Sequence, residues 1–248
     1  MKATATKNTT STQIMGDDNN HHSDNPLTNF THFYRQWLRR HSDLLHRDTI
    51  QLDQDKQQLL VEEILAHYND YLESKSDLAK HDVFLVISPP WLTPLERSLN
   101  WISDPRPSIA FRILSSSIEF DGLAAKQRER IEAVREETAR VEKELSDSIA
   151  RVQETAAGRP MAETAKRAAA AEWPEDDKTA AAEDYRRAMK AVVETADGLR
   201  RWAVLKVVEV LGPAHGLRFL CGLVNFQVDV REVGLELETQ RARNGGSY

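Results

Sequence analysis

SPPWLTPLERSLNWISDPRPS, residues 88–108, holds five of the nine prolines and two of the five tryptophans of this 248-residue chain. Within it, Thr93 can cap a helix and Pro94 suits the first helical position. Glu96 then completes the T-x-x-E pattern of a capping box, in which the first and fourth residues bond each other's backbone N–H groups. A short helix is therefore expected to begin inside this segment.

The remainder of the segment predicts an interrupted backbone. Pro105 is expected to end the short helix and Pro107 to start the next one, because proline disrupts a helix interior but fits its first turn. We interpret the segment as a tight helical corner with Trp91 and Trp101 as packing anchors. Two large aromatic side chains beside Arg97 could also line a pocket, so both interpretations stay open. The corner residues, structural or ligand-binding, are Trp91, Glu96, Arg97, Trp101, Arg106 and Pro107.

Helices are predicted on the amino-terminal side of the corner. Apolar residues recur at i, i+3 and i+4 from Pro26 to Leu45, and again from about Asp53 to Ala79. The apolar run from Val83 to Ile87 could be a strand by propensity. It has no plausible partner strand elsewhere, so a buried turn or a helix end is expected there.

The carboxyl-terminal half also predicts helices. From about Leu123 to Ala157, apolar residues at three- and four-residue spacing form a coiled-coil-like seam, which could be buried in the bundle or pair with a second subunit. The alanine-rich region 158–180 is expected to be a mobile excursion. A helix over about 181–211 should break at Gly212-Pro213. The last helix, about 214–233, is apolar on most sides and should lie centrally.

These patterns together predict an all-α protein: a helical bundle with a long coiled-coil-like helix and a proline-rich helical corner. Residues 1–25 are expected to be a disordered polar tail, because they contain almost no core-forming side chains. Residues 26–235 would form one helical domain, and residues 236–248 a carboxyl-terminal tail.

Composition excludes several kinds of site and partner. The single cysteine, Cys221, rules out an internal disulfide and a cysteine-built zinc site. The net charge of −6 argues against direct nucleic-acid binding. No run approaches the roughly 18 apolar residues of a membrane span, so no membrane association is expected. No nucleotide-binding or hydrolase motif occurs, and the histidines form no i, i+4 ligand pair. The residues alone therefore predict a non-enzymatic bundle without a metal site.

Two passages resemble a known family. ILAHYNDYLESKSDLAKHDVF and PPWLTPLERSLNWISDPRPSIAFRIL are similar to the plant Delay of Germination domain family, with its H-Y-x-x-Y helix, tryptophan-containing corner and R-P-S helix start. ADGLRRWAVLKVVEVLGPAHGLRFL resembles the late signature of that family. The resemblance spans about Phe30 to Gly234. Within the family, the sequence is most similar to the stand-alone dormancy regulators and Response to ABA and Salt proteins. The resemblance also extends to the TGA-type bZIP factors.

The resemblance implies a stand-alone regulatory protein. Dormancy-type members bind type 2C protein phosphatases through an aromatic segment of the first helix, and the comparable residues here are Phe33, Tyr34 and Trp37. These three share one apolar face, so a role in the core is the alternative.

Haem is the cofactor that the resemblance brings into question. Dormancy-type relatives hold haem with two histidines one turn apart, just before an E-x-G sequence. Gln227 and Arg231 stand at those positions here, and neither is a normal iron ligand. No haem, and no other cofactor, is therefore expected.

The function expected from the resemblance is protein–protein interaction in abscisic-acid-linked seed dormancy, germination or stress signalling, in the nucleus, the cytoplasm or both. The alternatives are a transcription-regulatory component that works with bZIP partners, and a small-ligand sensor with Trp91 and Trp101 as its pocket wall. A homodimer is a further expected partnership, through the coiled-coil-like seam.

Overall fold

A computed structural model describes residues 25–45, 52–119, 122–157 and 175–245. Within these ranges the chain forms helices and no strand, so the predicted all-α fold is confirmed. The tail expected over 1–25 and most of the excursion expected over 158–180 lie outside the described residues. The helices are α1 Pro26–Leu45, α2 Gln54–His81, α3 Val83–Ile87, α4 Pro94–Leu99, α5 Ile109–Ser117, α6 Ala125–Ala157 and α8 Glu175–Gly245.

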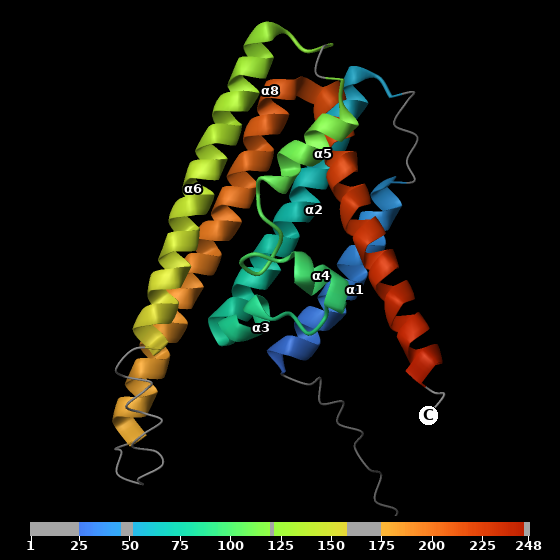
Figure 1. Ribbon diagram of the computed structural model, residues 1–248. Coiled ribbons are helices and arrows are strands. Elements are labelled where there is room, and N and C mark those ends of the chain that lie inside the picture. Colours follow the sequence, from blue (N-terminus) through green and yellow to red (C-terminus); the bar gives the residue numbers. More distant parts are fainter. Residues whose placement is uncertain (1–24, 46–51, 120–121, 158–174, 246–248) are drawn as a thin grey trace, which may run out of the picture.

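The long helices run alternately up and down the bundle (Figure 1). α1 rises and α2 descends beside it; α3, α4 and the following loop turn the chain at the lower end. α5 leads back up, α6 descends, and α8 rises along α6 before it turns downward again. This path brings α1, α2, α4, α5 and α6 all against α8.

Local sequence signals explain where the helices around the corner begin. The side chain of Asp53 caps α2 by accepting the Lys56 N–H at 2.9 Å. The capping box of α4 is confirmed: the hydroxyl of Thr93 accepts the Glu96 N–H at 3.3 Å, and Glu96 accepts the Thr93 N–H at 2.6 Å. The Val83–Ile87 run is a short helix, capped by Asp82, and agrees with the expectation of a buried helix end.

The end of the corner differs from the prediction. α4 stops at Leu99, six residues before the proline that was expected to end it, and α5 starts at Ile109, two residues after Pro107. The loop between them contains Ser103 in the left-handed region, with φ 61°. This loop is set by tertiary hydrogen bonds to α2 and α8, described below, rather than by its prolines.

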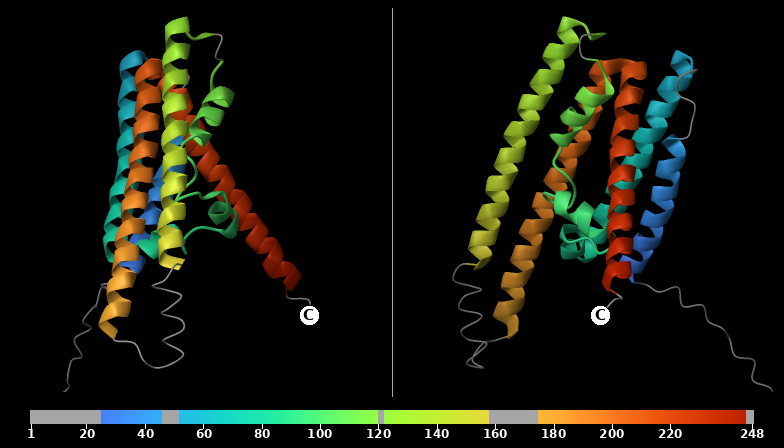
Figure 2. Two further views of the ribbon diagram at one scale, coloured as in Figure 1. Left: turned by 60° about the vertical axis from the view of Figure 1, so that its left-hand side comes forward. Right: turned by 45° about the vertical axis from the view of Figure 1, so that its right-hand side comes forward.

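The seam of α6 packs inside the chain. Ile131, Thr138 and Leu145 are buried, and α6 lies along the rising part of α8 in all three views (Figures 1 and 2). Of the two alternatives for the seam, burial within the bundle is therefore the one observed. A homodimer stays a prediction, and it would need another surface.

α8 contains two helices joined by a sharp turn. Gly212 has φ 70° and ψ −179°, a conformation that glycine adopts without the steric cost of a side chain, so the break predicted at Gly212-Pro213 is confirmed. The part of this helix over Ala182–Asn244 is long and apolar enough to cross a membrane by length and composition. However, 44% of its most apolar window is buried against the rest of the protein, as in a core helix.

The two ends of α8 require corrections. Residues 175–180, expected within the mobile excursion, already belong to the helix. The carboxyl-terminal tail expected from residue 236 is instead helical to Gly245. The helix predicted over 214–233 does bury part of its apolar surface, because Leu217, Phe219, Leu220 and Val224 belong to the core. Its end differs: Val233, Leu235 and Leu237 are exposed where the last part of α8 extends beyond the bundle (Figure 2).

Candidate functional site

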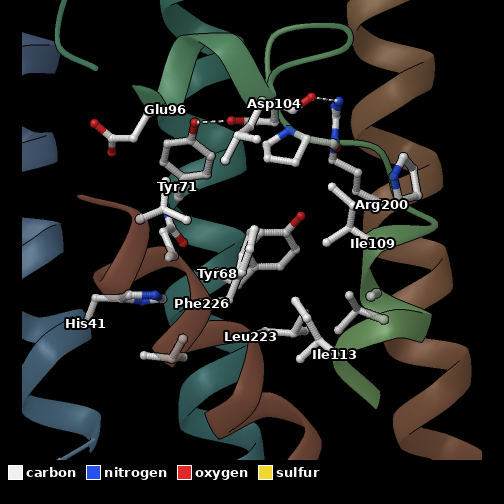
Figure 3. A pocket seen from close by; sticks show the side chains of 18 of the residues that line it. His41, Tyr68, Tyr71, Glu96, Asp104, Ile109, Ile113, Arg200, Leu223 and Phe226 are labelled. Carbon is white, nitrogen blue, oxygen red and sulfur yellow. Dashed lines mark hydrogen bonds between the residues drawn. The ribbon is translucent and has the colours of Figure 1, made fainter. Parts of the chain in front are cut away.

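A cavity of about 190 Å³ lies between the corner and the upper bundle, and it is partly open to solvent. Five elements meet around it: α1, α2, the corner, α5 and α8, which contributes residues from both sides of its turn at Gly212 (Figure 3). Most of its wall is apolar. The apolar lining residues include Ile64, Leu65, Leu92, Leu99, Ile109, Ile113, Val204, Leu220, Leu223, Val224, Phe226 and Val230.

Tyr68 occupies the middle of this cavity. It belongs to the H-Y-x-x-Y segment of α2, and its ring and hydroxyl project into the space between α5 and α8 (Figure 3). Burial raises the pKa of this hydroxyl far above its ordinary value. Among the described residues, the hydroxyl of Tyr68 makes no hydrogen bond. The neutral hydroxyl of Tyr68, which can both donate and accept a hydrogen bond, therefore points into an apolar space.

A buried charge cluster lies at the corner end of the cavity. We use this name for Lys75, Asp104, Asp197 and Arg200. The ammonium group of Lys75, whose side chain is only 1% exposed, pairs with the carboxylate of Asp104 and lies 2.7 Å from Oδ1 of Asp197. Arg200 donates to that same Asp197 oxygen at 2.7 Å. Two positive and two negative groups therefore balance one another inside the bundle.

Arg200 holds the corner loop by its backbone. Its guanidinium donates to the carbonyl oxygens of Ile102 at 2.5 Å, Asp104 at 2.7 Å and Pro105 at 2.9 Å. The hydroxyl of Tyr71 donates to the Asp104 carboxylate at 2.9 Å, which ties the loop to α2 as well. These bonds explain how the loop keeps its irregular shape around Ser103.

The charge cluster fixes the protonation of Asp104. Burial by itself would raise the pKa of this carboxyl, but the charges of Lys75 and Arg200 and the hydrogen bonds from Lys75 and Tyr71 hold it below its usual value. Burial, followed by the negative charge of Asp104, raises the pKa of Tyr71 well above its ordinary value. The cavity end is therefore lined by an ionised carboxylate and a neutral phenol.

A second ion pair joins the corner to the far end of α8. Nη1 of Arg231 lies 2.9 Å from Oε2 of Glu96 and donates to the carbonyl oxygen of Trp91 at 2.9 Å. α8 also approaches the corner closely at Gly234, where a Cβ atom would lie 2.2 Å from the hydroxyl oxygen of Thr93. Glycine at 234 therefore permits the contact that lets Arg231 reach Glu96.

A cluster of three rings lies on the α1 side of the cavity. The ring centroid of Trp37 lies 4.4 Å from that of His41 and 4.7 Å from that of His67, and the two imidazole centroids are 5.4 Å apart. The indole N–H of Trp37 donates to the His67 carbonyl oxygen at 2.8 Å. Burial is the main cause that lowers the pKa of His41 to about 3 and that of His67 to about 4. Both imidazoles are therefore neutral at pH 7.

The structure separates the residues that were predicted for the corner. Glu96, Arg106 and Pro107 line the cavity, but Trp91, Arg97 and Trp101 do not. The two tryptophans therefore do not form the wall of this cavity: Trp91 packs against α1 and Trp101 reaches α6, contacts that suit packing anchors. Trp91 is buried against Phe30, with ring centroids 4.4 Å apart. Trp101 is only partly buried; its indole N–H donates to Oγ of Ser146 at 3.2 Å, and Arg106 lies 4.8 Å from its ring centroid. Arg97 is exposed and donates to the Leu92 carbonyl oxygen.

The aromatic residues of α1 that were predicted to bind a partner lie mainly in the core. Tyr34 is 1% exposed and Trp37 is 4% exposed, whereas Phe33 is partly exposed. A partner that contacts Tyr34 or Trp37 would have to displace α1 from the bundle. Only Phe33 is accessible at the surface in this arrangement.

Several residues of the cavity and of the charge cluster gave no signal in the sequence. Lys75, Asp197 and Arg200 stand at spacings typical of solvated helix faces, and a single sequence offers no sign that they are buried. Tyr68 and Tyr71 were recognised as part of a family motif, without a role. Ile113 and Leu223 are apolar residues of predicted helices, and only the tertiary structure places them in the wall of a cavity between α5 and α8.

Comparison with known proteins agrees with the motifs. A family model described as DOG1, seed dormancy control, matches residues 35–116. Protein RESPONSE TO ABA AND SALT 1 of Arabidopsis thaliana is 30% identical over 217 residues, which cover 82% of this chain and 94% of that protein. Protein ZW2 of the same plant is 29% identical over 83% of this chain and 96% of its own length. Transcription factor TGA7, also from Arabidopsis thaliana, is 27% identical over 78% of this chain but only 51% of its own length. The chain thus belongs to the DOG1 seed dormancy control family.

Proposed function

We propose that this protein is a regulatory adaptor in abscisic-acid-linked seed dormancy, germination or stress signalling, and that it acts by binding other proteins rather than by catalysis. The observation that carries the proposal is the match over 94% of RESPONSE TO ABA AND SALT 1, because it relates the whole helical bundle to a protein named for that response. The geometry is consistent with an adaptor. The charged groups of the cavity bond one another and the backbone, so they serve to hold the corner in place.

The proposed partners are type 2C protein phosphatases, and the proposed contact is the exposed part of α1. Phe33 is the aromatic residue of that helix that a partner can reach without unfolding it. A location in the nucleus, the cytoplasm or both would suit such a role.

Calorimetric titration of purified protein with a type 2C phosphatase tests this proposal. Phe33→Ala should weaken binding by about tenfold or more, as expected for an aromatic contact at an interface. Phe84→Ala is the matched control, because Phe84 is another surface aromatic residue, 43% exposed, on α3. Equal weakening by both variants would contradict the assigned contact, and no binding by the unaltered protein would contradict the phosphatase as partner.

The relation to TGA7 favours a second candidate function, a transcription-regulatory component that works with a bZIP protein. This chain covers about half of that transcription factor, so the remaining half of TGA7 has no counterpart in the match. The proposal requires that the isolated chain does not shift a DNA probe with a TGACG site, whereas a bZIP partner and the chain together form a larger complex on it. A salt-resistant shift by the chain alone would contradict it.

A further inference from the structure

We infer that the cavity around Tyr68 is a binding site for a neutral, compact and mainly apolar small molecule with one hydroxyl or carbonyl group. Its size sets the first limit. An engineered apolar cavity of about 150 Å³ is known to bind benzene. The 190 Å³ measured here therefore suits a molecule slightly larger than one aromatic ring.

The charges at the cavity exclude ionised ligands. An acidic ligand would face the carboxylates of Asp104 and Glu96, which line the cavity and already pair with Lys75 and Arg231. Arg200 uses its donors on Asp197 and on three loop carbonyl groups, so it offers no free cation to a carboxylate. A cationic ligand would meet Arg200 at the same end. Since a buried charge without a partner is strongly unfavourable, a neutral ligand fits best.

The remaining cation at the cavity is already engaged at the rim. Arg106 is exposed, lies over the ring of Trp101 at 4.8 Å and is 3.8 Å from Oε2 of Glu142. An interaction with an acid there would be in contact with solvent and therefore weak. The rim does not change the preference for a neutral ligand.

Tyr68 supplies the polar anchor. Its hydroxyl points into the cavity and, among the described residues, makes no hydrogen bond (Figure 3). Ligand pockets typically combine apolar walls with a few such polar groups, which orient the bound molecule. The burial that raises the pKa of this phenol also keeps it neutral, so it can donate to a carbonyl or hydroxyl oxygen.

The cavity is also formed before any ligand binds. The corner loop that forms one end of the cavity is fixed by Arg200 and Tyr71, and the contact of Arg231 with Glu96 fixes the last part of α8 to the corner. Leu99 lines the cavity and is 39% exposed, which marks a side where a ligand can enter. A ligand would therefore find the cavity formed rather than having to open the bundle.

The test is titration of the purified chain with 2-naphthol, followed by fluorescence and by calorimetry. We expect saturable one-to-one binding. Naphthalene, which lacks the hydroxyl, and 2-naphthoate, which carries a charge, should each bind about tenfold more weakly or worse, because one loses the hydrogen bond and the other buries a charge. Binding of 2-naphthoate as tight as that of 2-naphthol would overturn the preference for a neutral ligand.

Tyr68→Phe is the decisive variant. It should weaken 2-naphthol binding by about tenfold, leave naphthalene binding unchanged, and leave the melting temperature nearly unchanged, because the removed hydroxyl has no partner in the protein. Tyr185→Phe is the matched control, because Tyr185 stacks on Phe84 outside the cavity. Ile109→Trp should fill the cavity and abolish binding of both probes. Full binding by a folded Ile109→Trp protein, or no saturable binding by the unaltered chain, would overturn the inference.

Discussion

Replacement of Lys75 by methionine tests the buried charge cluster directly. The side chain of Lys75 is 1% exposed, and its two partners, Asp104 and Asp197, are 16% and 13% exposed. Lys75→Met keeps most of the side-chain volume, but it leaves two carboxylates close together with only Arg200 between them. Removing one partner of a buried ion pair typically costs about 3–5 kcal/mol. That loss is a large share of the roughly 5–15 kcal/mol by which a domain is normally stable.

Urea denaturation at pH 7, followed by circular dichroism, measures this loss. Lys80→Met is the matched control, because Lys80 lies on the same helix and pairs with Asp77 at 2.6 Å, but both side chains are exposed. The control should leave the free energy of unfolding nearly unchanged, as exposed ion pairs contribute little. Equal denaturation midpoints for the two variants would refute the view that the cluster holds the corner in place.

The double variant gives a second check on the same reasoning. Asp197 keeps Arg200 as a partner after Lys75→Met, whereas Asp104 loses its salt bridge, and Asp104→Asn removes that carboxylate. The two substitutions together should therefore destabilise the protein by less than the sum of their separate effects. Additive losses would show that Lys75 and Asp104 do not act as one unit.

Three further predictions concern stability and haem. Gly234→Ala should lower the free energy of unfolding by about 1–3 kcal/mol, because its Cβ would collide with the corner. Gly198→Ala, with no atom within 4 Å of the added Cβ, should raise the free energy of unfolding by about 0.5–1 kcal/mol. A higher melting temperature for Gly234→Ala than for Gly198→Ala would refute the assigned close approach. The folded-state pKa values of His41 and His67, about 3 and about 4, lie below the ordinary 6.5, so the unfolded chain binds more protons in acid. The stability that these two histidines contribute should therefore be complete above pH 6.5 and fall as the pH drops towards 4. Equal urea midpoints at pH 7 and pH 5 would contradict this. We expect no haem binding at the position of Gln227, and a saturable Soret shift with hemin that is lost in Gln227→Ala would show the opposite.

Much of the fold follows from local sequence signals. The capping box at Thr93 and Glu96 and the break at Gly212 depend on residues within one helical turn of each other, so their geometry can be inferred without the rest of the protein. The periodicity of α2 and α6 predicted those helices nearly to their observed ends. The motifs that identify the family also lie in these segments, which is why the family could be recognised from the chain alone.

The candidate site depended on contacts between distant segments. Lys75 and Asp197 are 122 residues apart, and nothing in the pattern around either residue distinguishes a buried charge from a solvated one. Trp91 and Trp101 looked equivalent as pocket walls, yet neither lines the cavity. Trp101 adjoins the loop that Arg200 holds, and the backbone of Trp91 accepts a hydrogen bond from Arg231, so both positions depend on bonds to a helix about 100 residues or more later.

The sequence by itself determined the helices, their caps and the family, because those depend on backbone preferences and spacing over a few residues. Only the tertiary structure decided which faces meet, which charges are buried and where the cavity lies. The last part of α8 illustrates the difference: Val233 and Leu237 are as apolar as core residues, yet they are exposed. Burial depends on whether another element covers a side chain: Leu220 and Val224, earlier on the same helix, are buried, whereas its end extends past the elements that could cover it.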